Sequence, residues 1–143
     1  MQIYNIKDVI FEIECQDIFK LLNQLTDAPP IEVEIIYNKI TSLPNNQNIF
    51  VILNEHKKLI GMITIIIESK LIHGGKSVGH IEDLVVDSEY RGLGIGRRLV
   101  EFCKTYSKQN NCYKTILDCN DETRKFYEKN GFTHKNCGMS LYF

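Results

Sequence analysis

Residues 80–106 read HIEDLVVDSEYRGLGIGRRLVEFCKTY, and this stretch decides the fold. The apolar run that ends at Val86 predicts a strand, and the apolar residues from Ile95 to Tyr106 recur with the period of a helix. A glycine-rich loop with arginines at both edges joins the two. Such a unit aims several backbone N–H groups and a helix N-terminus at one point. We therefore expect an anion there, most naturally a pyrophosphate.

The spacing of the glycines separates this loop from two other phosphate-binding loops. It reads G-x-G-x-G, whereas a dinucleotide-binding turn reads G-x-G-x-x-G and follows its strand tightly. Here the segment from Asp87 to Arg91 lies between the strand and the first glycine. No Gly-Lys-Ser/Thr follows, which argues against a P-loop. The glycines alone could make only a turn, but arginines at the start of a helix oppose its dipole, and a bound anion would offset that repulsion.

The composition indicates one folded domain over residues 1–143. With 43% hydrophobic and 24% charged residues, the chain can bury a core. The net charge of −1 favours neither nucleic acid nor an anionic membrane as a partner. The longest apolar run, Met62 to Ile67, is too short to span a bilayer, and the N-terminus shows no secretion signal. The five cysteines include no C-x-x-C pair, so we expect no disulfide framework, no metal site and a cytoplasmic location.

Three strands upstream of the loop have short connections, which predicts an antiparallel meander over Asn48–Leu53, Leu59–Glu68 and Val78–Val86. The helix after the loop leads to a parallel strand, as in a right-handed βαβ unit. The remaining expected elements are strands at Met1–Ile6, Lys114–Cys119, Phe132–Lys135 and Gly138–Phe143, and helices at Glu14–Leu25, Glu32–Ile40 and Asp121–Lys129. Together they predict an α/β fold (α+β mixed), with a largely antiparallel sheet of about six or seven strands and about four flanking helices.

The loop RGLGIG at Arg91–Gly96 resembles the acyl-CoA pyrophosphate loop, R/Q-x-x-G-x-G/A, of the GNAT superfamily of N-acetyltransferases. Four further blocks resemble the glucosamine-6-phosphate N-acetyltransferases within it: IIESKLIH at 66–73, GHIED at 79–83, NCYKTILDC at 111–119 and KFYEKNGF at 125–132. The resemblance implies the acyl-CoA N-acyltransferase fold and acetyl-CoA as cosubstrate. It further implies acetyl transfer to the 2-amino group of glucosamine 6-phosphate, a step of UDP-N-acetylglucosamine biosynthesis, by a homodimer whose sites are completed across the interface.

The same resemblance implies catalytic roles for three residues. Tyr127 would donate a proton to the leaving thiolate, and its phenol is chemically suited to that role. Glu82 and Asp118 are both candidates for orienting the amine or removing its proton, and the choice between them stays open. A direct attack is favoured over an acetyl-enzyme, because no cysteine has a histidine partner suggested by the sequence.

The implied binding residues fall into two groups. A bulge in the strand at 78–86 would open a slot for the pantetheine arm, and the cofactor would contact Leu84, Val85, Val86, Arg91, Gly92, Leu93, Gly94, Ile95, Gly96, Arg97, Asn120 and Tyr127. The sugar phosphate would contact Thr26, Lys70, His73, Glu82, Asp83, Tyr113, Lys114 and Asp118.

One position departs from the family pattern. Tyr142 stands three residues after Met139, where an arginine for the phosphate is expected. A phenol can donate a hydrogen bond to phosphate but supplies no charge. Another cation could compensate, phosphate affinity could be weaker, or the substrate could differ. Two alternatives therefore stay open: an acetyltransferase for another small amine, and a non-catalytic acyl-CoA-binding module, which would not need Tyr127.

Overall fold

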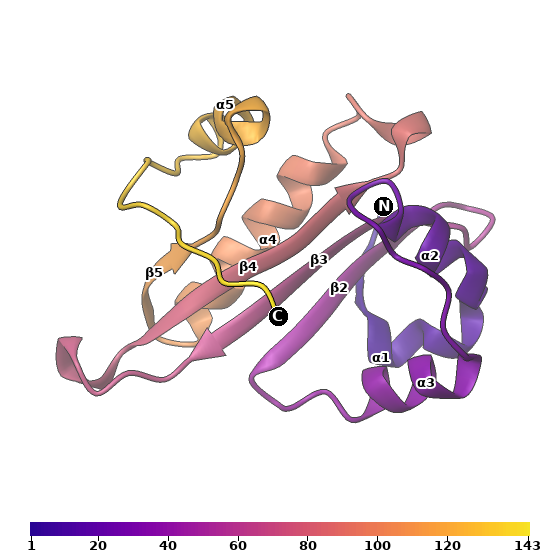
Figure 1. The fold of residues 1–143 in the computed structure, drawn as a ribbon, viewed down its shortest axis with the longest axis horizontal. Helices are drawn as coiled ribbons and strands as arrows, with labels where there is room; N and C mark the ends of the chain where they lie inside the picture. The colour runs from indigo at the N-terminus through magenta and orange to yellow at the C-terminus, as the bar shows by residue number, and fades with distance from the viewer.

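Five strands in the order β1-β2-β3-β4-β5 form one sheet in the computed structural model, which describes residues 1–143 (Figure 1). The strands are β1 (Ile3–Asn5), β2 (Gln47–Leu53), β3 (Leu59–Glu68), β4 (Ser77–Val86) and β5 (Cys112–Ile116). The helices are α1 (Ile6–Val9), α2 (Cys15–Leu22), α3 (Val33–Thr41), α4 (Ile95–Gln109) and α5 (Asp121–Lys129). Short 3₁₀ turns span Ile10–Glu12, His73–Gly75 and Ser88–Tyr90. β1 to β4 pair antiparallel and β4 to β5 parallel, so the predicted meander and the βαβ unit are confirmed.

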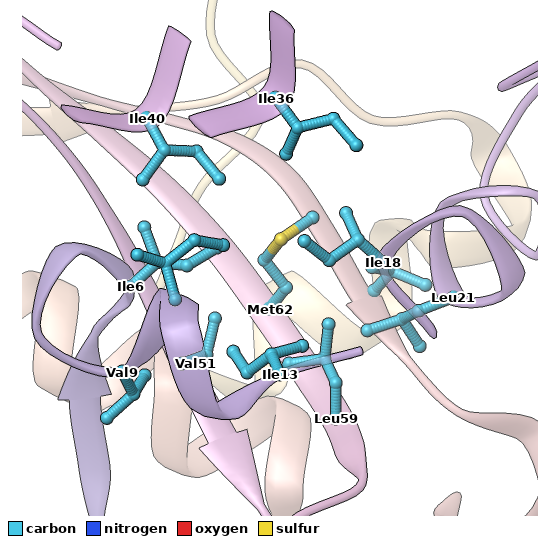
Figure 2. Packing of buried hydrophobic residues seen from close by; sticks show 12 residues of the cluster. Ile6, Val9, Ile13, Ile18, Leu21, Ile36, Ile40, Val51, Leu59 and Met62 are labelled. Atoms are coloured by element: carbon cyan, nitrogen blue, oxygen red, sulfur yellow. The ribbon is translucent and has the colours of Figure 1, made fainter. Parts of the chain in front are cut away.

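Two apolar clusters cover the two faces of the sheet. Figure 2 shows the first, in which Ile18 of α2 and Ile36 of α3 lie over Met62 of β3. The second packs α4 against the opposite face, with Leu99 fully buried. Burying a side chain of this size stabilises the fold by about 1.5–3 kcal/mol. Helices therefore pack on both faces of the sheet. The packing of α4 also fixes the position of the loop that precedes it.

The strand count is lower than expected because the last two predicted strands do not form. Residues 133–143 make no backbone hydrogen bond to the sheet, and their side chains are exposed. An apolar, β-prone segment becomes a strand only when a neighbouring backbone pairs with it, and within one chain none does. The predictions of strands at Phe132–Lys135 and Gly138–Phe143 are therefore wrong for the single chain.

Several element ends differ from their predicted positions, and two of these differences bear on the site. The helix expected to reach Leu25 ends at Leu22, because the Asn23 side chain donates to the Phe19 carbonyl at 3.0 Å and bonds Ala28 on the other side. The strand expected at Lys114–Cys119 is displaced to Cys112–Ile116. Asp118 thus lies in the loop beyond β5.

A β-bulge interrupts β4 at its two acids. Met62 of β3 pairs with Val85 of β4, and Thr64 pairs with Glu82. One residue thus separates the pairs on β3, whereas two separate them on β4. Asp83 has a φ of 50°, in the left-handed region that a bulge commonly requires of one residue. The bulge that the resemblance implied in this strand is confirmed.

The bulge changes which face of the sheet the later side chains occupy. Residues four apart in a strand normally share a face, yet Ile81 packs on the α4 side and Val85 on the opposite side. Glu82 and Asp83, which simple alternation would place on opposite faces, are both exposed. One inserted residue thus presents two carboxylates to solvent in the middle of a buried strand.

Candidate active site

β5 leaves β4 halfway along its length. Their pairing runs from Ser77 opposite Cys112 to His80 opposite Ile116 and then stops, although β4 continues to Val86. The second half of β4 therefore has no strand neighbour on this side. Its backbone groups there are available to a ligand, as the pantetheine slot requires.

The ladder on the other side of β4 decides which backbone groups face this open edge. The N–H of Asp87 donates to the Ile60 carbonyl of β3 at 3.0 Å. Because antiparallel pairs alternate, the backbone groups of Val86 and Leu84 point away from β3 and toward the open edge. Arg91 already uses one of them, since its Nε donates to the Val86 carbonyl at 3.1 Å. Val85 instead pairs with Met62, and its side chain is buried.

The glycine-rich loop ends in a helix start without a cap. Gly92 and Gly94 have φ values of 80° and 79°, which other residues adopt at a cost. Gly94 is the N-cap of α4, no side chain caps it, and the first turn holds no acid. The first N–H groups of α4 therefore lack partners, and they lie at the positive end of the helix dipole. This arrangement suits an anion, as the sequence predicted.

The surface over this helix start is hollowed and basic. A depression of about 340 Å³ is lined in part by Leu93, Gly94, Arg97 and Arg98, with Glu101 as its one acid. Both arginines are exposed, and neither forms an ion pair in the chain. Arg97 and Arg98 lie in the first turn of α4, where the helix dipole repels positive charge. An anionic ligand would offset this repulsion.

The third glycine of the loop has a packing role that its spacing did not reveal. A Cβ at Gly96 would lie 3.3 Å from Phe126 Cζ of α5 and 3.6 Å from Val86 Cγ2 of β4. A side chain at Gly96 would need the Phe126 ring to move by a few tenths of an ångström. α5 itself begins at Asn120, whose Oδ1 accepts from the Thr123 N–H at 2.9 Å. The residue expected to touch the cofactor thus also caps the helix that carries Tyr127.

Tyr127 is held by two aromatic rings. Its ring meets Phe126 at 5.0 Å and Phe132 at 6.0 Å, both edge to face. Burial raises the pKa of the phenol, and the neighbouring Cys119 raises it further. The phenol therefore keeps its proton at neutral pH, as a donor to a leaving thiolate must.

Glu82, Asp83 and Asp118 form one acidic cluster from two segments of the chain. Burial raises the pKa of Glu82, and the charges of Asp83 and Asp118 raise it further against an opposing effect of His80. A carboxylate destabilised by like charges is a better proton acceptor than an ordinary glutamate. The structure thus brings both candidate bases together and leaves the choice between them open.

Three of the residues implied for the sugar phosphate lie together near the N-terminal end of β4. The His73 ring lies over Tyr113 with centroids 4.1 Å apart, and Lys114 Nζ lies 5.5 Å from the centre of the same ring. His73 belongs to the turn between β3 and β4, which projects from the body of the molecule (Figure 1). These three side chains form a small cationic and aromatic surface.

Lys70 is engaged elsewhere. It forms an ion pair with Glu68, and the other oxygen of that carboxylate lies 2.6 Å from His80 Nε2. Hydrogen bonding by Lys70, and then by His80, lowers the pKa of Glu68. Sequence reasoning missed Glu68 and His80 as partners of the site. The signal was present in the pairing of antiparallel strands, which sets residues near 66 opposite His80.

Thr26 does not join this group within one chain. Thr26 lies just after α2. Its near neighbour Gln24 accepts a hydrogen bond from the Ser88 N–H, and Ser88 lies just beyond the C-terminal end of β4. His73 lies before the start of β4 at Ser77. β4 spans 10 residues, so the two places are roughly 30 Å apart.

The C-terminal tail passes close to the acidic cluster. A Cβ at Gly138 would lie 3.5 Å from Asp118 Oδ1. Tyr142, at the position where an arginine is expected, is 91% exposed and touches none of the other phosphate residues through a hydrogen bond.

No group of three or more His, Cys, Asp and Glu side chains is arranged to hold a metal ion. None of the helices combines the length and the apolar character needed to cross a membrane.

Comparison with known proteins connects this geometry to a family. The model of the acetyltransferase (GNAT) family matches residues 10–132. Glucosamine 6-phosphate N-acetyltransferase of Arabidopsis thaliana is 39% identical over 128 residues, which are 87% of this chain and 86% of the relative. The enzyme of the same name from Trypanosoma brucei brucei is 36% identical over 136 residues, 93% and 92% of the two chains. The crystal structure of the Arabidopsis enzyme superposes with a TM-score of 0.84 at 35% identity, covering 99% of this chain and 97% of that one.

Proposed function

The chain belongs to the acetyltransferase (GNAT) family, and on that premise we propose that it is an acetyl-CoA-dependent glucosamine 6-phosphate N-acetyltransferase. One observation carries the proposal. The open edge of β4 runs between an uncapped, glycine-rich helix start and a cluster of carboxylates, with a protonated phenol nearby. A thioester cofactor anchored by its pyrophosphate and an amine acceptor need these three parts side by side.

Backbone groups of the chain make most of the contacts that bind acetyl-CoA. The unpartnered N–H groups at the start of α4 hold the pyrophosphate, and Arg91 and Arg97 add positive charge. The open edge at Leu84 and Val86 holds the amides of the pantetheine arm by strand-like hydrogen bonds. A backbone N–H of this edge also stabilises the oxyanion that forms when the amine attacks the thioester carbonyl.

The acidic cluster prepares the acceptor amine. An amine attacks only in its neutral form, so a proton must leave it. Glu82, with its raised pKa, and Asp118 are the two groups suited to orient the ammonium and accept its proton. Tyr127 then supplies a proton to the leaving thiolate of coenzyme A.

A homodimer completes the sugar-phosphate site. Thr26 and the group of His73, Tyr113 and Lys114 lie at opposite ends of β4, so one chain cannot bring them to one phosphate. The exposed apolar residues of the C-terminal tail, Met139 and Leu141 among them, give a partner chain a surface to cover. Two variants that each lack one half, Thr26→Val and Lys114→Ala, should regain part of the lost activity when they are co-expressed as mixed dimers. A monomer in sedimentation with full activity would contradict the dimer.

The product, N-acetylglucosamine 6-phosphate, would feed UDP-N-acetylglucosamine biosynthesis in the cytoplasm. All five cysteines are unpaired, which agrees with a reducing compartment.

The test is turnover of acetyl-CoA with a panel of amines. Glucosamine 6-phosphate should have the highest kcat/KM, and glucosamine, which lacks only the phosphate, should be at least about tenfold poorer, a difference of about 1.4 kcal/mol. Polyamines and amino acids complete the panel. Equal rates for glucosamine and its phosphate would contradict the proposed substrate.

A second acceptor class, small amines without phosphate, is favoured by one observation. Lys70 is paired with Glu68, and Tyr142 replaces the expected arginine, so fewer free cations face a phosphate than the family pattern implies. The same panel decides between the two classes.

A further inference from the structure

We infer that Gln24 couples the acceptor site to the cofactor site, by tying the segment that carries Thr26 to the turn that leads into the glycine-rich loop. The inference rests on the proposed function, because it takes the glycine-rich loop as the acetyl-CoA site and the Thr26 segment as part of the acceptor site. Gln24 itself is a positioning residue and touches neither ligand.

The turn before the loop is held by a buried carboxylate. Asp87 is 6% exposed, and its Oδ1 accepts from the Glu89 N–H at 3.0 Å. Its Oδ2 lies 3.1 Å from Lys58 Nζ, which comes from the turn between β2 and β3. Burial alone would raise the pKa of Asp87, but the hydrogen bonds from the Glu89 N–H, from Lys58 and from Gln24 outweigh it and lower that pKa. The carboxylate is therefore ionised at neutral pH and keeps the 3₁₀ turn Ser88–Tyr90 in place.

The same turn is fixed on its other side. Asn54 donates to the Tyr90 hydroxyl at 2.9 Å, and Lys58 Nζ lies 5.8 Å from the centre of the Tyr90 ring. Lys58 also pairs with Glu89 at 3.2 Å. The turn before Arg91 can therefore shift only if several bonds break together. Its residues move as one rigid unit.

Gln24 is the contact between this unit and the Thr26 segment. The Ser88 N–H donates to Gln24 Oε1 at 2.8 Å, a bond that links residues 64 apart. Thr26 lies two residues after Gln24, and its N–H donates to the Leu22 carbonyl at 3.0 Å. Gln24 and Thr26 thus belong to one short, internally bonded turn that follows α2.

Coupling follows from the shared bond. A ligand that favours the position of the Thr26 segment seen here also favours the matching position of the cofactor turn through the Gln24–Ser88 bond, so the second ligand meets a larger population of the state that binds it. By linkage, each ligand must raise the affinity of the other by the same factor. Removal of the Gln24 side chain removes its bonds to the Ser88 N–H and to Asp87, and with them the coupling factor, while neither ligand loses a direct contact.

The experiment is calorimetric titration of coenzyme A, which allows no turnover, with and without saturating glucosamine 6-phosphate. In the native protein the sugar phosphate should tighten coenzyme A binding about fivefold or more. Gln24→Ala should reduce this factor to about twofold or less, while its affinity for coenzyme A alone stays within about twofold of the native value. Gln24 is exposed, so the variant should fold normally.

Asn23→Ala is the matched control. Asn23 bonds Ala28 across the same segment at 2.8 Å but makes no bond to the cofactor turn. It should weaken binding of the sugar phosphate and preserve the coupling factor. If Gln24→Ala keeps the native factor, or the native protein shows none while it acetylates glucosamine 6-phosphate, the inference is wrong. If the native protein does not acetylate that amine at all, the proposed function is what fails.

Discussion

The proposed cofactor side and the proposed acceptor side of the site are built in opposite ways. The cofactor side comes from one continuous stretch, in which a bulged strand, a turn, a glycine loop and a helix start follow one another from residue 80 onward. The acceptor side collects residues from four separated segments, and Thr26 lies roughly 30 Å from His73. A contiguous site is determined by local backbone geometry. A dispersed site depends on how the sheet, and a second chain, arrange its parts.

The largest expected effect concerns Tyr127, the proposed proton donor. Tyr127→Phe keeps the aromatic contacts with Phe126 and Phe132 but removes the proton donor. We expect kcat to fall about 10²–10⁴-fold, with KM for acetyl-CoA and Tm nearly unchanged. Steady-state kinetics and thermal unfolding measure the two quantities. An unchanged kcat would remove the proton-donor role of Tyr127.

Glu82→Gln should lower turnover about 10²-fold while it leaves the protein as stable or more stable. The folded-state pKa of Glu82 is raised, so its ionised form is disfavoured by the fold. Ionised Glu82 therefore lowers the free energy of unfolding. This loss is absent below the pKa of Glu82 in the unfolded state and is fully present above its pKa in the folded state, as at pH 7. Thermal unfolding of the native protein and the variant at pH 4 and pH 7 checks the sign. A lower Tm at pH 7 without loss of kcat would make Glu82 structural.

Asp118→Asn is the companion variant. It removes one of the like charges that raise the pKa of Glu82, so the acid limb of the kcat/KM profile should move to lower pH if Glu82 is the base. If Asp118 is itself the base, the acid limb should disappear and kcat should collapse. The pH–rate profile of this one variant thus decides a question that the geometry leaves open.

The anion site can be tested at the residue that the loop geometry constrains most. Gly94 has a φ of 79°, and Asn tolerates this conformation better than other residues with a Cβ. Gly94→Asn should raise KM for acetyl-CoA about tenfold by crowding the approach of the pyrophosphate, with a smaller change in kcat. An unchanged KM would contradict the pyrophosphate assignment. Gly74→Asn, at a φ of 69° in the turn between β3 and β4, is a control for backbone strain alone.

The smallest expected effect lies on the acceptor side. Glu68→Gln removes the charge that holds Lys70, so Lys70 becomes available to a phosphate. We expect KM for glucosamine 6-phosphate to fall about threefold, and KM for glucosamine to stay the same. A rise in KM for the phosphate would show instead that Glu68 positions Lys70 correctly.

Much of the fold could be predicted from the sequence because it follows from local periodicity. The meander, the helix after the glycine loop and the helix at 121–129 have the predicted type, and the bounds of β3 and α5 match. The two C-terminal strands and the end of β5 were mispredicted, because strand formation depends on a partner that local sequence does not specify. The pairs Glu68–Lys70 and Gln24–Ser88 were also missed. One is an ion pair that competes with an expected phosphate contact, and the other joins residues far apart in the chain.

The sequence by itself determined the local features of the proposed cofactor side. Glycines at positive φ, a helix start without an acid and the two consecutive carboxylates are local features, and their physical consequences hold wherever the chain places them. Only the tertiary structure decided that β5 leaves β4 after His80, that Phe126 of α5 packs close to Gly96, and that Thr26 lies away from Lys114. These features depend on contacts between residues distant in sequence, and such contacts form only when the sheet and helices pack.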